Sequence, residues 1–267
     1  MVHFLQPLVF GIVQGLTEFL PVSSTAHLTL LPFFTGWQDP GLAFDVALHI
    51  GTLVAVIAFF WKDWLNIFSS ALTGYKKEGL EGFKKEALYF LIIATIPGAF
   101  FGILFEKKAE TVFRSPLLIA ITLIVVGAIL YWADKKHQGV RKLKDVGLKD
   151  ALVVGFSQAL AVIPGFSRSG TTIAAGLYRG LDKISAARFS FLLSTPIIMG
   201  AAIVELPRLI RSGIDSAVII GIISSMIFGY LSIKYMLKFL EKYGYAIFFW
   251  YRLLLGLVVI AVYFLLR

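Results

Sequence analysis

Six apolar stretches, each about long enough to cross a bilayer, restrict the fold of this chain more than any other feature. They cover residues 44–61, 87–105, 116–133, 186–206, 214–235 and 246–266. A spanning helix needs about 20 mostly apolar residues, and these runs are continuous rather than alternating, which excludes a transmembrane β-barrel. The sequence therefore predicts an all-α polytopic membrane protein with six spans.

The composition agrees with a membrane protein. Hydrophobic residues make up 58% of the chain and charged residues 15%, whereas soluble domains average about 25% charged residues. This excludes a soluble enzyme, a disordered chain and, despite the net charge of +9, a nucleic-acid-binding protein. Because the chain has no cysteine, disulfides and thiolate chemistry are excluded as well.

Two further apolar stretches are interrupted in the middle. Residues 4–34 are broken at Leu20–Thr25, and residues 151–178 are broken at Ile163–Gly170. Each arm has roughly 10–16 residues, which at about 1.5 Å per residue is shorter than the hydrocarbon core of about 30 Å. We expect two re-entrant helical hairpins, whose polar turns lie near the middle of the membrane inside protein.

The two hairpins resemble each other and divide the chain. Residues 11–16 (GIVQGL) parallel residues 155–160 (GFSQAL), and each hairpin is followed by three spans. Since three is odd, the second copy must be inverted. The sequence predicts a single integral membrane domain, residues 1–267, built from two inverted repeats at about 1–133 and 134–267. This architecture is also typical of transporters, so a polyprenyl-phosphate or anion transporter or flippase is the alternative to an enzyme.

Lysine and arginine are unevenly distributed between the two sides of the predicted membrane domain. Of the 25 basic residues, 17 fall on the side that holds loops 62–86 and 134–149, and 6 fall on the other side. Cytoplasmic loops carry the excess of Lys and Arg. We therefore expect these two loops to be cytoplasmic and both termini to be extracytoplasmic.

Polar side chains concentrate in the two hairpins, although polar groups inside a membrane are costly and by default mark a functional site. Hairpin one carries Gln14, Glu18, Ser23, Ser24, Thr25 and His27. Hairpin two carries Gly165, Ser167, Arg168, Ser169, Gly170 and Thr172. The second arm of each hairpin begins at its polar turn, so free backbone N–H groups and two helix dipoles converge there and favour an anion.

The residue types in these turns indicate phosphoryl chemistry on a substrate that arrives through the lipid. Arg168 offers a planar fork of donors that suits phosphate oxygens, and the two glycines of this hairpin let the backbone approach a ligand closely. Ser24 is a candidate nucleophile, with Glu18 and His27 as candidate acid/base groups. A purely structural ion pair between Glu18 and Arg168 is the simpler alternative.

Three ionisable residues outside the hairpins have simpler interpretations. Asp45 and His49 lie at the start of a span and are expected only to orient it. Arg252 lies near an end of the last span, and its head group is expected to snorkel to the membrane surface.

Four segments carry a resemblance to a known family. Residues 14–28, QGLTEFLPVSSTAHL, resemble the first signature of the bacterial undecaprenyl-diphosphate phosphatases of the bacitracin-resistance (BacA/UppP) family. Residues 164–172, PGFSRSGTT, resemble the second signature, and residues 44–52 and 251–253 match further family segments. The resemblance extends over residues 1–267 in the same order.

The resemblance implies hydrolysis of undecaprenyl diphosphate to undecaprenyl phosphate and inorganic phosphate. This reaction recycles the carrier lipid for peptidoglycan synthesis and confers bacitracin resistance. It implies a bacterial inner-membrane location, with the active site opening to the outer face. The expected partners are the polyprenyl pyrophosphate substrate and membrane lipids, with no nucleic acid, and a homodimer is left open.

The residue types and the resemblance together indicate roles for individual residues, although the motif alone does not fix the nucleophile. The expected catalytic residues are Glu18, Ser24, His27 and Arg168. Ser24 is expected to attack the terminal phosphorus, and direct attack by water is the alternative. The expected substrate contacts are Gln14, Ser23, Thr25, Gly165, Ser167, Ser169, Gly170 and Thr172.

A divalent cation, Mg²⁺ or Ca²⁺, is generally described as assisting this family. The family's acidic motif, Glu/Gln-x-x-x-Glu, begins here with Gln14, which leaves Glu18 as the single acid and the single candidate metal ligand. We therefore expect a cation to be held mainly by the pyrophosphate oxygens of the substrate, as Mg²⁺ commonly is.

Overall fold

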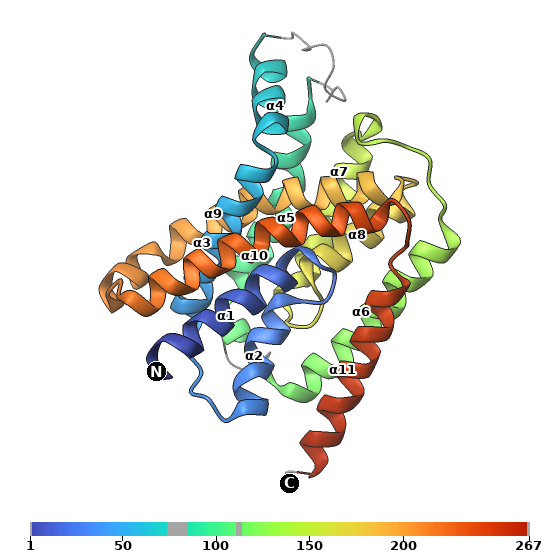
Figure 1. Cartoon of the computed structure of the whole chain (residues 1–267). Helices are drawn as coiled ribbons and strands as arrows, with labels where there is room; N and C mark the ends of the chain where they lie inside the picture. Colours follow the sequence, from blue (N-terminus) through green and yellow to red (C-terminus); the bar gives the residue numbers. More distant parts are fainter. Residues whose placement is uncertain (1, 74–84, 111–113, 266–267) are drawn as a thin grey trace.

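The computed structural model describes residues 2–73, 85–110 and 114–265, and its elements there are helices (Figure 1). The α-helices are α1 (Val2–Phe19), α2 (Ser24–Thr35), α3 (Leu42–Phe59), α4 (Trp61–Thr73), α5 (Ala87–Glu110), α6 (Pro116–Lys136), α7 (Leu148–Ala159), α8 (Arg168–Tyr178), α9 (Lys183–Ser212), α10 (Ser216–Leu240) and α11 (Ala246–Leu265). Two short 3₁₀ helices, η2 (Leu143–Asp145) and η3 (Leu160–Val162), flank α7.

The six expected spans are confirmed as helices. In the described part of the chain, α3, α5, α6, α9, α10 and α11 are long and apolar enough to cross a membrane. Their bounds differ from the expected ones by a few residues, because helices continue into polar flanks that hydropathy alone excludes. The fold class predicted from the sequence, an all-α polytopic membrane protein, is therefore confirmed.

The segment that was expected to be a polar loop, residues 62–86, is partly helical. Helix α4 occupies Trp61–Thr73 and projects from the body at the top of Figure 1. Its apolar residues recur at helical spacing, which hydropathy averaged over the segment does not reveal. Lys76, Lys77 and Lys84 of this segment lie outside the described residues.

Both broken stretches are pairs of helices with a sharp break between them. Helices α1 and α2 are separated by residues 20–23, and η3 and α8 are separated by residues 163–167. Helix α1 has 18 residues, about 27 Å at the α-helical rise, so it is longer than the expected arm. Its apolar sequence extends upstream to Val2 with no residue that stops a helix, since Pro7 is tolerated inside it.

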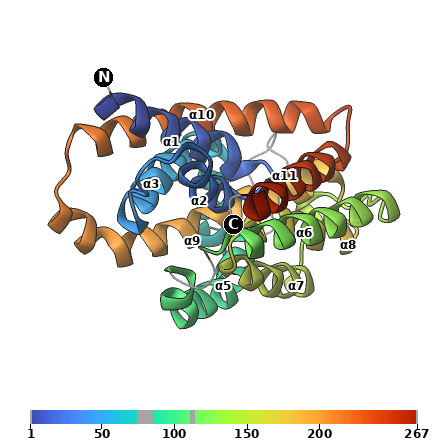
Figure 2. The same ribbon diagram turned by 90° about the horizontal axis from the view of Figure 1, so that it is seen from below.

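The broken helices are packed inside the bundle, where non-helical backbone can be satisfied by protein. Helix α1 lies against α10, and α11 lies along α6 (Figure 2). At Gly15 of α1, a Cβ would come within 2.7 Å of the backbone of Gly229 in α10, so only glycine allows this approach. Small residues at such contacts are typical of membrane helices.

The ends of the helices segregate to opposite sides of the molecule. The start of α1 and the end of α11 lie in the lower part of Figure 1, whereas α4 and the segment between α6 and α7 lie in the upper part. This segment is anchored by Arg141, which donates to both carboxylate oxygens of Asp150 at 3.0 and 2.6 Å. The orientation of the chain in the membrane and the inverted relation of the two repeats both stay predictions.

Candidate active site

The two helix breaks have the same backbone geometry. Ser23 precedes α2 with φ 73°, and Ser167 precedes α8 with φ 63°. Their side chains cap the new helices, because Ser23 Oγ accepts from the amide of Ala26 at 3.4 Å and Ser167 Oγ accepts from the amide of Gly170 at 3.0 Å. The first amides of each helix have no partner within the helix, so they stay available at the breaks.

The two breaks contact each other directly. The amide of Gly165 donates to Ser23 Oγ at 3.2 Å, and Ser169 Oγ donates to the carbonyl of Leu20 at 3.0 Å. The N-termini of α2 and α8 therefore converge, as the sequence predicted. Two helix N-termini that meet inside protein form a favourable environment for an anion.

Glu18, at the end of α1, connects the two breaks. Its Oε2 accepts from Ser24 Oγ at 2.6 Å and from Gln14 Nε2 at 3.0 Å, and its Oε1 accepts from an Arg168 nitrogen at 2.8 Å. Gln14 and Glu18 share a helix face because they are four residues apart. The only carboxylate of hairpin one therefore links a hydroxyl and a guanidinium from opposite halves of the chain.

His49 also belongs to the cluster of polar residues around Glu18, which comprises Gln14, Glu18, Ser24, His49 and Arg168. It was expected only to orient α3. Its Nε2 lies 3.4 Å from Glu18 Oε2, and its Nδ1 lies 2.7 Å from the carbonyl of Asp45. Because a carbonyl can only accept, Nδ1 carries a proton and Nε2 is the ring nitrogen that faces the site. The sequence held two signals: a polar pair, Asp45 and His49, four residues apart in an apolar helix, and the match of residues 44–52 to a family segment.

Hairpin two contributes Arg168 and its supports. Arg168 donates to the carbonyl of Ser190 in α9 at 3.2 Å, in addition to its bond with Glu18. Thr172 shares a 2.6 Å hydrogen bond with the hydroxyl of Ser190 and donates to the carbonyl of Arg168 at 2.7 Å. Thr172 and Gly170 therefore support the turn, and Ser190 is a support that the sequence did not indicate.

His27 is placed differently from the other predicted residues. Its Nδ1 lies 2.7 Å from the carbonyl of Ser23, and its Nε2 lies 2.6 Å from the hydroxyl of Tyr251 in α11. The two rings are stacked with an interplanar angle of 6°. Both ring nitrogens are thus engaged by protein groups, and the acid/base role of His27 stays a prediction.

A cavity of about 200 Å³ opens beside the cluster. Its polar lining is Glu18, Ser23, Ser24, Thr25, His49, Ser167, Arg168 and Ser169. Its apolar lining is Val46, Ala161, Ile163, Pro164, Ile197, Ile198 and Ala201. The cavity therefore combines polar residues of the two breaks and adjoining helices with apolar residues of α3, η3, the second break and α9.

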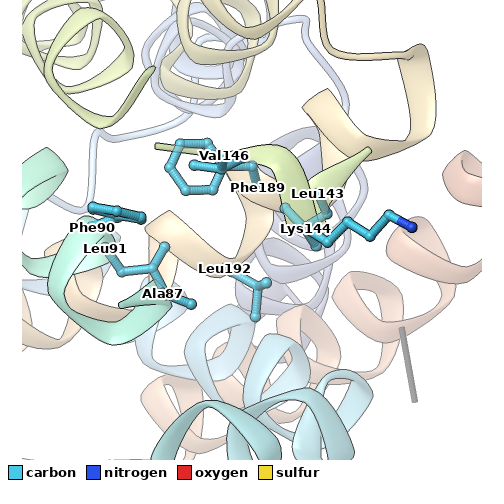
Figure 3. Close-up of a pocket in the computed structure, with 8 residues that line it drawn as sticks. All are labelled: Ala87, Phe90, Leu91, Leu143, Lys144, Val146, Phe189 and Leu192. Atoms are coloured by element: carbon cyan, nitrogen blue, oxygen red, sulfur yellow. The ribbon is translucent and has the colours of Figure 1, made fainter. Parts of the chain in front are cut away.

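A second cavity lies apart from this cluster, between α5, η2 and α9 (Figure 3). Its volume of about 20 Å³ holds little more than one water molecule. The lining is apolar except for Lys144, whose amine extends away from the other lining residues in Figure 3. It offers no reactive group, so the larger cavity is the candidate active site.

The donors around Glu18 do not suit a metal ion. Both carboxylate oxygens already accept from N–H or O–H groups, and one of these donors is the cationic Arg168. Within the described ranges, no group of three or more His, Asp or Glu side chains could hold a metal. These residues therefore do not form a metal site by themselves, and the involvement of Mg²⁺ or Ca²⁺ stays a prediction.

Comparisons with known proteins agree with one another. A family model described as "Bacitracin resistance protein BacA" matches residues 7–258. A protein named undecaprenyl-diphosphatase from Pelotomaculum thermopropionicum is 51% identical over 255 residues, which is 96% of this chain and 95% of the relative. One of the same name from Moorella thermoacetica is 51% identical over 263 residues, covering 98% and 99% of the two chains. A third, from Methanosphaera stadtmanae, is 42% identical over 271 residues.

Proposed function

Because this chain belongs to the BacA family, we propose that it hydrolyses undecaprenyl diphosphate to undecaprenyl phosphate and inorganic phosphate in a bacterial inner membrane. The observation that carries this proposal is the mixed lining of one cavity, to which Ser24, Glu18 and Arg168 contribute polar groups and Ile197 and Ile198 contribute apolar ones. The polar groups suit a pyrophosphate and the apolar groups suit the first isoprene units of a lipid. The reaction regenerates the carrier lipid of peptidoglycan synthesis, which fits the bacitracin resistance named in the family description.

The proposed first step is attack by Ser24 on the terminal phosphorus. A bond forms between Ser24 Oγ and phosphorus, the bond from phosphorus to the bridging oxygen breaks, and undecaprenyl phosphate leaves with the bonding electrons. The hydroxyl proton passes to Glu18 Oε2, which lies 2.6 Å away. Water then hydrolyses the phosphoserine, which releases inorganic phosphate and restores the Ser24 hydroxyl.

Arg168 and the backbone amides stabilise the charge that develops on the phosphate oxygens. Two of the guanidinium nitrogens donate to Glu18 and Ser190, and since arginine has five N–H groups, others remain for the substrate. The amides at the starts of α2 and α8 add fixed dipoles of the same sign. Preorganised donors of this kind are usually the largest contribution to such catalysis.

Direct attack by water remains the alternative to the serine nucleophile. In that case Glu18 takes a proton from water, and Ser24 holds the carboxylate and a phosphate oxygen in place. Acid quenching during turnover distinguishes the two routes. A phosphorylated protein that is absent from Ser24→Ala supports the serine route, and its absence from the active wild type supports water.

A transporter on the same scaffold is the second candidate, and the comparisons do not favour it, since the relatives carry the name of an enzyme. The test is phosphate release by purified protein in detergent with undecaprenyl diphosphate. Hydrolysis at a rate that falls with Glu18→Gln supports the phosphatase. If the purified wild type releases no phosphate while sealed vesicles move the lipid, the proposal is refuted.

We further propose that both termini are extracytoplasmic and that the cavity opens to the outer face, in a single domain of two inverted repeats. The uneven distribution of basic residues and the matching geometry of the two breaks support this arrangement. Because the chain lacks cysteine, Lys142→Cys is a unique site for a membrane-impermeant thiol reagent. Labelling from the cytoplasmic side alone is expected. Labelling from outside alone would show that the chain has the opposite orientation in the membrane.

A further inference from the structure

Arg252, in α11, is completely buried and does not snorkel to the surface, so the expectation from the sequence is wrong. Its Nε donates to the carbonyl of Leu123 at 2.8 Å. Its two terminal nitrogens donate to Pro21 at 3.0 Å, to Gly165 at 2.7 Å and to Thr122 at 3.4 Å, in each case at the carbonyl oxygen. One side chain therefore contacts both helix breaks and α6.

The two carbonyls in the breaks occupy equivalent positions. Pro21 and Gly165 each lie two residues before the serine that caps the following helix, and three residues before Ser24 and Arg168, respectively. The two terminal nitrogens of Arg252 thus hold corresponding points of the two breaks at a distance fixed by one rigid, planar guanidinium.

Ser24 and Arg168 are the residues that bind opposite oxygens of Glu18. Ser24 donates to Oε2 and Arg168 donates to Oε1. Any relative shift of the two breaks changes the separation of these two donors, since each lies within one turn of the carbonyl that Arg252 holds. The geometry of the reacting groups is therefore coupled to Arg252, although Arg252 does not line the cavity.

The buried charge of Arg252 makes its bonds to the two breaks necessary. In the described part of the chain its hydrogen bonds go to backbone carbonyls and none goes to a carboxylate. A buried cation without a counterion depends on its hydrogen bonds for compensation. Pro21 and Gly165 are buried, so their carbonyls in turn need a donor supplied by the protein. The guanidinium and the carbonyls of the breaks therefore depend on each other for hydrogen bonds.

We propose that Arg252 is a positioning residue of the phosphatase site. By bonding both breaks at once, it sets the distance between Ser24, the proposed nucleophile, and Arg168. This inference rests on the proposed function. It goes beyond that function because it assigns a role in the reaction to a helix that contributes no residue to the cavity. Lysine cannot replace Arg252, since a single ammonium cannot reach carbonyls that lie around three separate nitrogens.

The test compares Arg252→Lys with Arg141→Lys in purified full-length protein. Arg141 is a matched control, because it also bonds carbonyls and Asp150, but near the start of α7 and outside the cavity. The assay measures kcat and KM for phosphate release from undecaprenyl diphosphate, normalised to the monodisperse folded fraction. Arg252→Lys is expected to lower kcat by roughly 10²-fold, on the scale of a misplacement of about 1 Å, with KM changed less than about threefold. Arg141→Lys is expected to leave both constants near those of the wild type.

A double variant separates positioning from a loss of fold. If Arg252 acts through the placement of Arg168, then Arg168→Lys lowers kcat far less in the Arg252→Lys protein than in the wild type. Multiplicative losses in the double variant would refute the positioning role. So would a wild-type kcat in Arg252→Lys, whereas an inactive wild type would refute the proposed function itself.

A second substitution covers the case in which Arg252→Lys does not fold. Thr122 in α6 donates through Oγ1 to the carbonyl of Pro164 at 2.8 Å, so it holds the same break as Arg252 but carries no charge. Thr122→Val is nearly isosteric and is expected to lower kcat severalfold at unchanged KM. An unchanged kcat would show that the position of this break does not control the reaction and would overturn the proposal.

Discussion

Replacing Glu18 by glutamine removes the group to which both halves of the site are bonded. The carboxylate accepts from Ser24 and Gln14 on one oxygen and from Arg168 on the other, with His49 3.4 Å from the first. An amide has one accepting oxygen and one donating nitrogen. With its oxygen toward Arg168, the new side chain would donate from its nitrogen to the Ser24 hydroxyl, so it could no longer take the Ser24 proton, and the negative charge that balances Arg168 would be gone.

The magnitude follows from burial. The side chains of Glu18 and Arg168 are 5% and 13% accessible, and removing one partner of a buried ion pair costs about 3–5 kcal/mol. Because Arg168 keeps its bond to the Ser190 carbonyl and reaches the cavity, we take the lower value of about 3 kcal/mol. Loss of a positioned acid/base lowers kcat by roughly 10²–10⁴-fold. Glu18→Gln is thus expected to lower both turnover and the temperature of unfolding.

Glu205→Gln is the matched control for this experiment. Glu205 is also buried and is paired with an arginine, at 3.1 Å from Arg208, but it lies in α9 outside the cavity. Phosphate release per folded molecule and thermal unfolding in detergent are measured for both variants. The control is expected to lose stability while keeping its kcat. If Glu18→Gln kept a kcat within about threefold of that of Glu205→Gln, Glu18 would be a structural residue and the proposed chemistry would be wrong.

The remaining predictions concern the other groups of the site. Ser24→Ala is expected to lower kcat by at least about 10²-fold without loss of insertion, measured by phosphate release; near-normal turnover would leave water as the nucleophile. Arg168→Lys is expected to lower kcat by roughly 10²-fold, and by more than it raises KM, because one ammonium replaces a planar pair of donors; a rise in KM alone would place Arg168 in ground-state binding only. If His27 acts through its bond to Tyr251, then His27→Gln and Tyr251→Phe lower kcat equally and the double variant is no worse; a deep loss in His27→Gln alone would make it an acid/base group. Mg²⁺ is expected to raise activity by binding the pyrophosphate and not to raise the unfolding temperature without substrate; a clear rise without substrate would reveal a protein metal site.

The features that the sequence predicted are local ones. Apolar runs of spanning length fix the six long helices within a few residues, because an uninterrupted apolar helix is the stable state of such a run in lipid. The breaks at Leu20–Thr25 and Ile163–Gly170 follow from proline and glycine beside small polar residues. Even the convergence of the two polar turns could be predicted from the sequence, since isolated polar backbone inside a membrane must find a partner.

The contributions that the sequence did not reveal come from segments far away in the chain. His49 lies in an apolar span that matches a family segment, but hydropathy and spacing alone do not distinguish it from a residue that orients the helix. Tyr251 is 224 residues from its partner His27, and Arg252 is 231 residues from Pro21. Such pairs depend on how α11 and α6 pack against the breaks, which hydropathy and periodicity do not determine.

The two serines at the breaks show why strain is retained in this site. A residue other than glycine with φ near +65° is strained by about 1–3 kcal/mol, and glycine would adopt the same conformation without that cost. Glycine, however, has no hydroxyl. Ser23 Oγ accepts from the amide of Ala26 in its own helix and from that of Gly165 in the other break, so it both starts α2 and joins the two halves. Ser167 starts α8 in the same way and contacts Ser169. The strain is therefore offset by helix caps within each break and, at Ser23, by one hydrogen bond that forms only when the two breaks meet, which couples that part of the site to assembly of the whole bundle.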